Sequence, residues 1–267
     1  MENASKDVRS KLALLKIPSG EDILVGRMHI AEGAGPHPTI IMLHGFPGVI
    51  MNLDIASELH QKSWNVLVIN YRGAWGSQGT FSYTNALEDV QATIQYIKQN
   101  KVADENRIDI DRIGLLGHSF GGFLALKTAS TDPSIKAVAS LSPANLGLFV
   151  HMIEQNPAIE SQIYEGIKES SFFLHGCTAE SIMEEVRNNR NDWNTFLFAS
   201  TLVDRKLLLT AATHDDELPK AFFHDPLVQI LENDKEFQHK VFETDHGYTN
   251  VRKELALTLD EWFRQNL

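Results

Sequence analysis

The chain is poor in cysteine, in long apolar runs and in positive charge. A single cysteine, Cys177, excludes a disulfide within the chain. No apolar run reaches the length of a membrane span, and residues 1–20 lack the apolar segment of a signal peptide. Lys and Arg number 24 against 35 Asp and Glu, a formal net charge of −11. We therefore expect a soluble cytoplasmic protein that binds neither nucleic acid nor an anionic membrane surface, because both partners require a basic face.

The overall composition is that of a folded globular protein. Hydrophobic residues make up 43% of the 267 residues and charged residues 22%, and neither a repeat nor a low-complexity linker interrupts them. A chain of this length forms one large domain or two small ones and can bury roughly three quarters of its unfolded surface. A substantial hydrophobic core is therefore expected.

Short apolar runs alternate with helix-like segments along most of the chain. Strands are predicted at residues 11–17, 23–30, 38–43, 65–70, 113–116, 135–141, 206–212 and 240–242. Helices are predicted at residues 53–63, 83–100, 122–127, 227–231 and 251–263. The first two strands should form an antiparallel hairpin. The later alternation predicts an α/β fold with a mostly parallel central sheet and helices on both faces.

The alternation stops between residues 144 and 204, where helix-like segments rich in apolar side chains occur without a convincing strand. We interpret this segment as an inserted helical cap. The predicted core domain then consists of residues 1–143 and 205–267, and the cap of residues 144–204. Most apolar side chains of the cap should attach it to the core, and a few should line the roof of a pocket.

Residues 117–121 read GHSFG and lie between the predicted strand 113–116 and the helix-like residues 122–127. This pattern predicts a nucleophile elbow, a strained turn that exposes the hydroxyl of Ser119 above the sheet. The pattern alone occurs by chance in roughly one chain in ten of this length, so its position between strand and helix matters. Glycine suits the two outer positions because side chains there would collide with backbone. We expect His118 to point away from the serine.

A serine hydroxyl requires a base, and the base requires a carboxylate that orients it. Among eleven histidines, His246 is favoured because it follows the last predicted strand, at the sheet edge where ligands bind in open α/β folds. His214, in another loop at that edge, is the rival. Asp215, which follows the strand at residues 206–212, is the preferred carboxylate, and Asp216 is the main alternative.

The tetrahedral intermediate of acyl transfer carries an oxyanion that needs positioned donors. The N–H of Phe120, directly after the serine, is one candidate. The second should come from residues 44–48, which read HGFPG after a buried strand. Because Pro47 has no N–H, we expect Phe46 to supply this donor.

Residues 70–79 form the loop after the next strand. We predict that Arg72 makes a structural ion pair there and does not bind substrate. Trp75 is a candidate wall of a pocket, but the sequence does not decide this.

These segments together resemble the α/β-hydrolase superfamily. The resemblance is carried by residues 44–48, residues 117–121, Asp215 ahead of the Leu-Pro pair at 218–219, and His246 between Asp and Gly. The order Ser119, Asp215, His246 is the order found in that family. Residues 70–79 are similar to those of the esterase and prolyl-oligopeptidase-like branches. The resemblance implies an α/β-hydrolase fold and a serine hydrolase that forms an acyl-enzyme without a cofactor or a metal.

The expected function is hydrolysis of carboxylic esters with small, apolar acyl groups, through Ser119, His246 and Asp215. A peptidase or aminoacyl amidase is the first alternative, in which Glu154, Glu160 or Glu165 of the cap would bind a free amino terminus. A hydrolase-fold module that binds a small ligand without turnover is the second. The natural substrate and the oligomeric state stay open at this point.

Overall fold

The computed structural model of the protein describes residues 8–267, and its centre is one sheet of eight strands. The strands are Lys11–Ser19 (β1), Asp22–Ile30 (β2), His37–Leu43 (β3), Asn65–Ile69 (β4), Ile108–His118 (β5), Ala137–Leu141 (β6), Lys206–His214 (β7) and Phe237–Asp245 (β8). Their order in the sheet is β1-β2-β4-β3-β5-β6-β7-β8. β2 runs antiparallel to β1 and to β4, and the remaining neighbours are parallel. The predicted hairpin and the mostly parallel sheet are thus confirmed.

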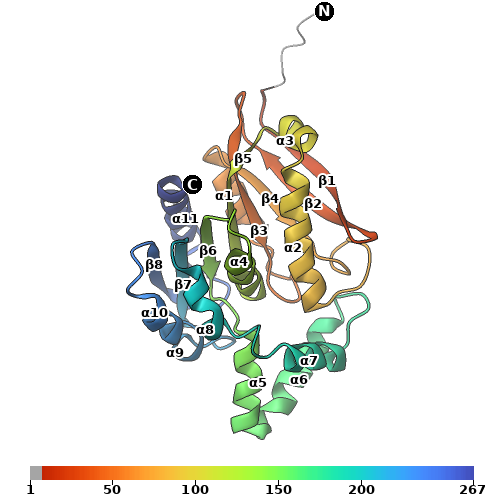
Figure 1. The fold of residues 1–267 in the computed structure, drawn as a ribbon, viewed down its shortest axis with the longest axis vertical. Helices are drawn as coiled ribbons and strands as arrows, with labels where there is room; N and C mark the ends of the chain where they lie inside the picture. The colour runs from red at the N-terminus through yellow and green to blue at the C-terminus, as the bar shows by residue number, and fades with distance from the viewer. Residues whose placement is uncertain (1–7) are drawn as a thin grey trace, which may run out of the picture.

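Helices cover both faces of this sheet, as predicted (Figure 1). The α-helices are Leu53–Gln61 (α1), Tyr83–Ile97 (α2), Asn100–Asn106 (α3), Phe120–Thr131 (α4), Leu146–Gln155 (α5), Glu160–Ser171 (α6), Ala179–Asn188 (α7), Thr195–Phe198 (α8), Lys220–Phe223 (α9), Asp225–Leu231 (α10) and Arg252–Asn266 (α11). Two short 3-10 helices span Pro157–Ile159 (η1) and Ala199–Leu202 (η2). No helix within residues 8–267 is long and apolar enough to cross a membrane.

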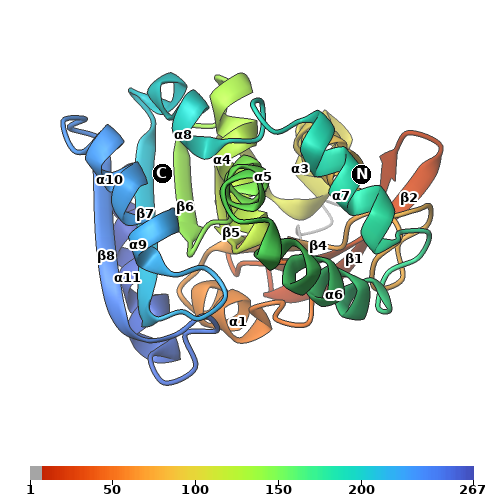
Figure 2. The same ribbon diagram turned by 90° about the horizontal axis from the view of Figure 1, so that it is seen from below.

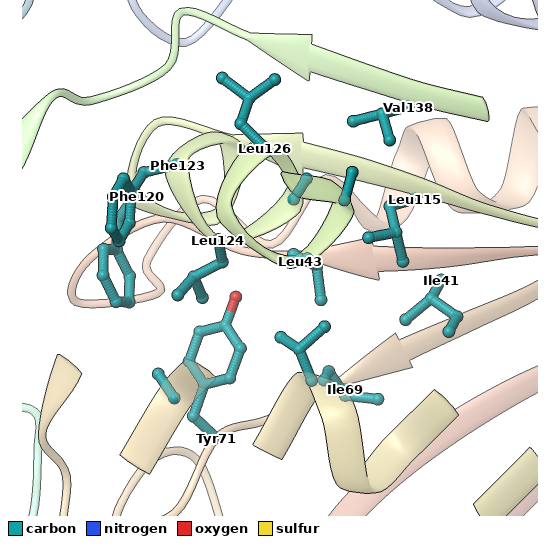
Figure 3. Packing of buried hydrophobic residues seen from close by; sticks show 14 of the residues in the cluster. Ile41, Leu43, Ile69, Tyr71, Leu115, Phe120, Phe123, Leu124, Leu126 and Val138 are labelled. Atoms are coloured by element: carbon teal, nitrogen blue, oxygen red, sulfur yellow. The ribbon is translucent and has the colours of Figure 1, made fainter. Parts of the chain in front are cut away.

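Two hydrophobic cores lie on opposite faces of the sheet. The larger one lies against α2 and α4, and the smaller one against α1 and α11. Every residue of β4 and of β6 is buried, as the continuous apolar runs predict for strands covered on both faces. Figure 3 shows Leu43, Tyr71 and Leu124 of the larger core beside one another. This core supports the junction of β5 and α4, where Ser119 lies.

Several elements differ from the sequence prediction, among them β5, which begins at Ile108 and is longer than the predicted residues 113–116. The helix expected at residues 83–100 is divided, because Gln99 takes an extended conformation between α2 and α3. β8 spans residues 237–245 and is therefore longer than the predicted residues 240–242. Most of its side chains are exposed or half-buried, because it is an edge strand that pairs only with β7. Such a strand carries polar residues and lacks the apolar run that identifies a central strand. The short helix α9 was not expected.

Residues 144–204 hold helices α5 to α8, and Figures 1 and 2 show α5, α6 and α7 at one end of the sheet, whereas α8 lies beside β7. Backbone hydrogen bonds join this segment to the loop after β4. The N–H of His175 donates to the carbonyl of Gly73 (2.8 Å), and the N–H of Phe81 donates to the carbonyl of His175 (2.9 Å). Cys177 next to this junction is buried. The division of the chain into a core and a cap domain stays a prediction.

Candidate active site

Ser119 occupies the sharp turn between β5 and α4. Its backbone has φ 57° and ψ −118°, a strained conformation for a residue with a side chain. A methyl group on Gly121 would lie 2.0 Å from the carbonyl oxygen of Leu43, and one on Gly117 would lie 2.0 Å from the carbonyl oxygen of Gly121. Both glycines are therefore required by the close approach of α4 to the strands, which explains the spacing of the GHSFG segment.

His246 and Asp215 meet at the ends of β8 and β7. His246 Nδ1 donates to Asp215 Oδ2 at 2.7 Å, and Asp215 is 5% exposed. The other oxygen of Asp215 accepts the N–H groups of Glu217 (3.1 Å) and Leu218 (2.7 Å). Asp216 is exposed to solvent. The structure thus brings Asp215, and not the alternative Asp216, to His246.

The surroundings of His246 favour its protonated form. Burial is the largest single effect and lowers the pKa of His246, but the hydrogen bond and charge of Asp215 lead a set of opposing effects that together raise the pKa above its usual value. The charges of Glu217 and Asp245 act in the same direction. Glu217 Oε2 lies 3.7 Å from His246 Nε2. Among the residues that the structure describes, the Ser119 hydroxyl makes no hydrogen bond to this nitrogen, a contact that often forms only with substrate bound.

The loop that carries His246 is held from two sides. His118 Nε2 donates to the backbone carbonyl of His246 (2.9 Å), and the two rings lie 4.8 Å apart. The hydroxyl of Tyr248 lies 3.0 Å from Ser142 Oγ and 2.7 Å from Thr210 Oγ1. His118 was not predicted to contact His246, and the structure shows that it supports the backbone of that residue. Only its position beside Ser119 could have indicated this.

The two expected oxyanion donors flank the serine. Phe120 is the first residue of α4, and its N–H has no carbonyl within the helix to bond. Within residues 8–267, neither this N–H nor that of Phe46 donates to another group. A methyl group on Gly45 would lie 3.6 Å from Ser119 Oγ, so the loop of residues 44–48 passes directly beside the hydroxyl. Both N–H groups are therefore available beside the serine.

Two aromatic residues of the loop after β4 hold residues 44–48 in place. The Tyr71 hydroxyl donates to the carbonyl of His44 (2.9 Å), and Trp75 Nε1 donates to the carbonyl of Pro47 (2.9 Å). Trp75 has φ 47°, and its ring stacks on that of Phe173 at 6.1 Å. Trp75 thus links residues 144–204 to the loop beside Ser119. From the sequence, Trp75 was considered only as a candidate wall of a pocket.

The remaining candidates lie apart from this centre. His214, the rival base, is exposed at the end of β7. Arg72 Nε donates to Asp89 Oδ1 (2.7 Å), and its Nη2 donates to Glu88 (2.6 Å), so the predicted structural ion pair is confirmed. In the described part of the chain, no group of three His, Cys, Asp or Glu side chains could hold a metal ion.

The surface carries two grooves, and one of them adjoins His246. One has a volume of about 490 Å³ between residues 49–54 and the start of α11, and it includes Gly247 beside the histidine. The other, of about 380 Å³, lies between α5 and the segment around α9. Apolar side chains line most of both grooves. The first groove therefore offers apolar surface beside the loop that carries His246.

Comparison with known proteins agrees with this architecture. The family model described as alpha/beta hydrolase fold matches residues 38–177, so the chain belongs to the α/β-hydrolase fold family.

Individual relatives are similar over parts of the chain. The chain is 26% identical over 180 residues to Esterase FrsA of Klebsiella pneumoniae, and the match covers 64% of this chain and 40% of that protein. It is 28% identical over 161 residues to Acylamino-acid-releasing enzyme 1 of Oryza sativa, covering 52% of this chain and 20% of that protein. The matched segments span less than half of either relative. A Pyrococcus furiosus esterase structure has the same fold, with a TM-score of 0.69 at 18% identity over 98% of this chain and 92% of that one.

Proposed function

We propose that the protein is a serine hydrolase that cleaves carboxylic esters with small, apolar acyl groups. The observation that carries this proposal is the hydrogen bond between His246 and the buried Asp215, formed at the sheet edge where the strained Ser119 also lies. Esterase FrsA and the Pyrococcus esterase support the reaction class through their similarity to this chain. The apolar grooves support an apolar substrate.

In the proposed reaction, Ser119 Oγ attacks the acyl carbon and His246 Nε2 takes its proton. Asp215 stabilises the resulting imidazolium, and the N–H groups of Phe46 and Phe120 bind the oxyanion. The carbon–oxygen bond to the alcohol then breaks, and His246 Nε2 gives its proton to the leaving oxygen. Water attacks the acyl-enzyme while His246 takes a proton, and this proton returns to Ser119 as the acid leaves.

Amide hydrolysis is the second candidate, favoured by the similarity to the rice acylamino-acid-releasing enzyme. The cap residues expected to bind a free amino terminus are poorly suited to it. Glu160 pairs with Arg187, Glu165 pairs with Lys168, and Glu154 is exposed on α5. We therefore prefer esters. The rate of hydrolysis of the ester p-nitrophenyl butyrate, compared with the rate for aminoacyl-p-nitroanilides, which are amides, distinguishes the two candidates.

Replacement of Ser119 tests the proposal directly. The Ser119→Ala variant should hydrolyse p-nitrophenyl butyrate on the order of 10⁴-fold more slowly than wild type, because no other group replaces the nucleophile. The Ser130→Ala variant, changed at the far end of α4, serves as the matched control and should retain full activity. A fluorophosphonate probe should label wild type and the control but not Ser119→Ala. Folded wild-type protein that resists labelling would favour a ligand-binding module.

A further inference from the structure

Glu217 is placed beside the catalytic candidate His246 by the structure of its own loop. Its backbone N–H donates to Asp215 Oδ1 (3.1 Å), and the N–H of Leu218 donates to the same oxygen (2.7 Å). The Leu218 side chain is buried, which fixes the far side of this turn. The Glu217 side chain is 71% exposed, and its Oε2 lies 3.7 Å from His246 Nε2. A carboxylate thus lies at the open side of the imidazole, opposite Asp215.

His246 Nε2 is the atom that protonates the leaving alcohol in the proposed reaction. A group attached to that alcohol therefore passes within reach of Glu217. Among the residues that the structure describes, no Lys or Arg pairs with Glu217. The neighbouring cations Arg252 and Lys220 are bound to Asp54 and Asp225, respectively. The charge of Glu217 is consequently without a cationic partner whenever His246 is neutral.

The charges that act most strongly on the imidazole are negative, and the nearby guanidinium of Arg252 is paired with Asp54. Asp215 and Asp245 both act on His246 as negative charges, and the Asp245 carboxylate accepts hydrogen bonds only from uncharged groups of Thr249 and Thr244. His118, the ring next to His246, is buried with a pKa of about 3 and is neutral. An anionic leaving group would meet repulsion here, whereas an ammonium group would be attracted.

We propose that Glu217 is a specificity residue that selects esters whose alcohol part carries a cationic amine. This inference rests on the proposed ester hydrolysis and names the substrate class for it. The ammonium group lies against the Glu217 carboxylate while His246 protonates the ester oxygen. The chemistry requires only a positive charge a few atoms from the leaving oxygen, so quaternary and protonated amines both qualify.

Two esters of one acid test this inference, because butyrylcholine and 3,3-dimethylbutyl butyrate have the same shape and differ in charge. Wild type should favour the cationic ester in kcat/KM by about threefold to fivefold at low ionic strength, as expected for a solvent-exposed ion pair. Glu217→Gln should reduce this ratio to about one when both esters are compared at a pH well above the midpoint of His246, so that the charge of the base does not affect the comparison. The preference of wild type for the cationic ester should also weaken in 0.5 M salt. The electrostatic screening length is about 10 Å at 0.1 M salt and becomes shorter as salt is added.

Asp216→Asn is the matched control, since Asp216 is an exposed acid of the same loop and lies away from His246. It should retain the preference for the cationic ester. An unchanged ratio in Glu217→Gln, or an equal loss in both variants, would overturn the role of Glu217. Hydrolysis of p-nitrophenyl butyrate that depends on Ser119 would in that case still support the proposed function. If that hydrolysis is independent of Ser119, the proposed function fails and the inference fails with it.

Discussion

At the scale of single residues, the site contains three buried histidines whose protonation differs because their partners differ. Burial lowers the pKa of His44 to about 4 and that of His118 to about 3, since each ring bonds only a backbone carbonyl. His246 is also buried, but the carboxylate of Asp215, together with the charges of Glu217 and Asp245, outweighs the burial and raises its pKa. Of the three rings, His246 is the one whose pKa is raised, and the proposed reaction assigns it the role of accepting and donating a proton.

The pH dependence of the reaction follows from this environment. In the proposed reaction His246 must be neutral to accept the serine proton, so kcat/KM should fall as the pH decreases through the pKa of His246, which is raised from its usual 6.5. Asp215→Asn removes the charge that raises this pKa, so the midpoint should move to lower pH and the rate should fall by about 10⁴. Initial rates with p-nitrophenyl butyrate between pH 5 and 9 measure both effects. A midpoint unchanged in Asp215→Asn would contradict the assignment.

At the scale of elements, the site depends on how closely α4 packs against the sheet. A methyl group on Gly122 would lie 2.6 Å from Ser140 Oγ on β6, in addition to the contacts at Gly117 and Gly121. Three glycines thus allow the amino end of α4 to touch β3, β5 and β6. This packing brings the residues after β3 next to Ser119, which directly precedes Phe120 at the start of α4.

Substitution of Gly121 tests this packing. Gly121→Ala places a methyl group 2.0 Å from the backbone oxygen of Leu43, so α4 must shift. The free energy of unfolding should fall by roughly 2–4 kcal/mol. Gly166→Ala is the matched control, because Gly166 lies within α6 with nothing within 4 Å of the added methyl group. It should stabilise the protein by roughly 0.5–1 kcal/mol. Urea unfolding of both variants measures the difference, and equal stabilities would refute the packing argument.

At the scale of the whole molecule, a buried ion pair connects the hairpin, the loop after β4 and α2. Asp89 on α2 is fully buried and accepts hydrogen bonds from Ser19 Oγ (2.6 Å), from Arg72 Nε (2.7 Å) and from the N–H of Arg72 (2.7 Å). The same loop carries Tyr71 and Trp75, which hold residues 44–48. The position of the expected oxyanion donor thus depends on contacts that extend to β1.

Removing the charge of Asp89 should destabilise the protein strongly. Asp89→Asn leaves the guanidinium of Arg72 buried without its main counter-charge, so the free energy of unfolding should fall by roughly 3–5 kcal/mol. Glu88→Gln removes the other, exposed partner of Arg72 and should cost less than about 1 kcal/mol. Urea titrations followed by circular dichroism provide both values. Similar losses in the two variants would show that burial does not distinguish the two ion pairs.

Much of the fold could be predicted because its signals are local. The apolar run at residues 38–43 and the GHSFG segment each indicate structure within a few residues of chain. The edge strand β8 was underestimated because its exposed side chains carry no such signal. The break between α2 and α3 was missed because it depends on the conformation of one residue, Gln99.

The sequence by itself determined the alternation of strands and helices, the elbow around Ser119 and the family to which the chain is similar. Only the tertiary structure decided between Asp215 and Asp216, because adjacent residues of one loop differ in which of them is buried against His246. It also decided that Glu217 lies beside the imidazole. These contacts join residues from different strands of the sheet. They follow from strand order and loop conformation, which periodicity along the chain does not encode.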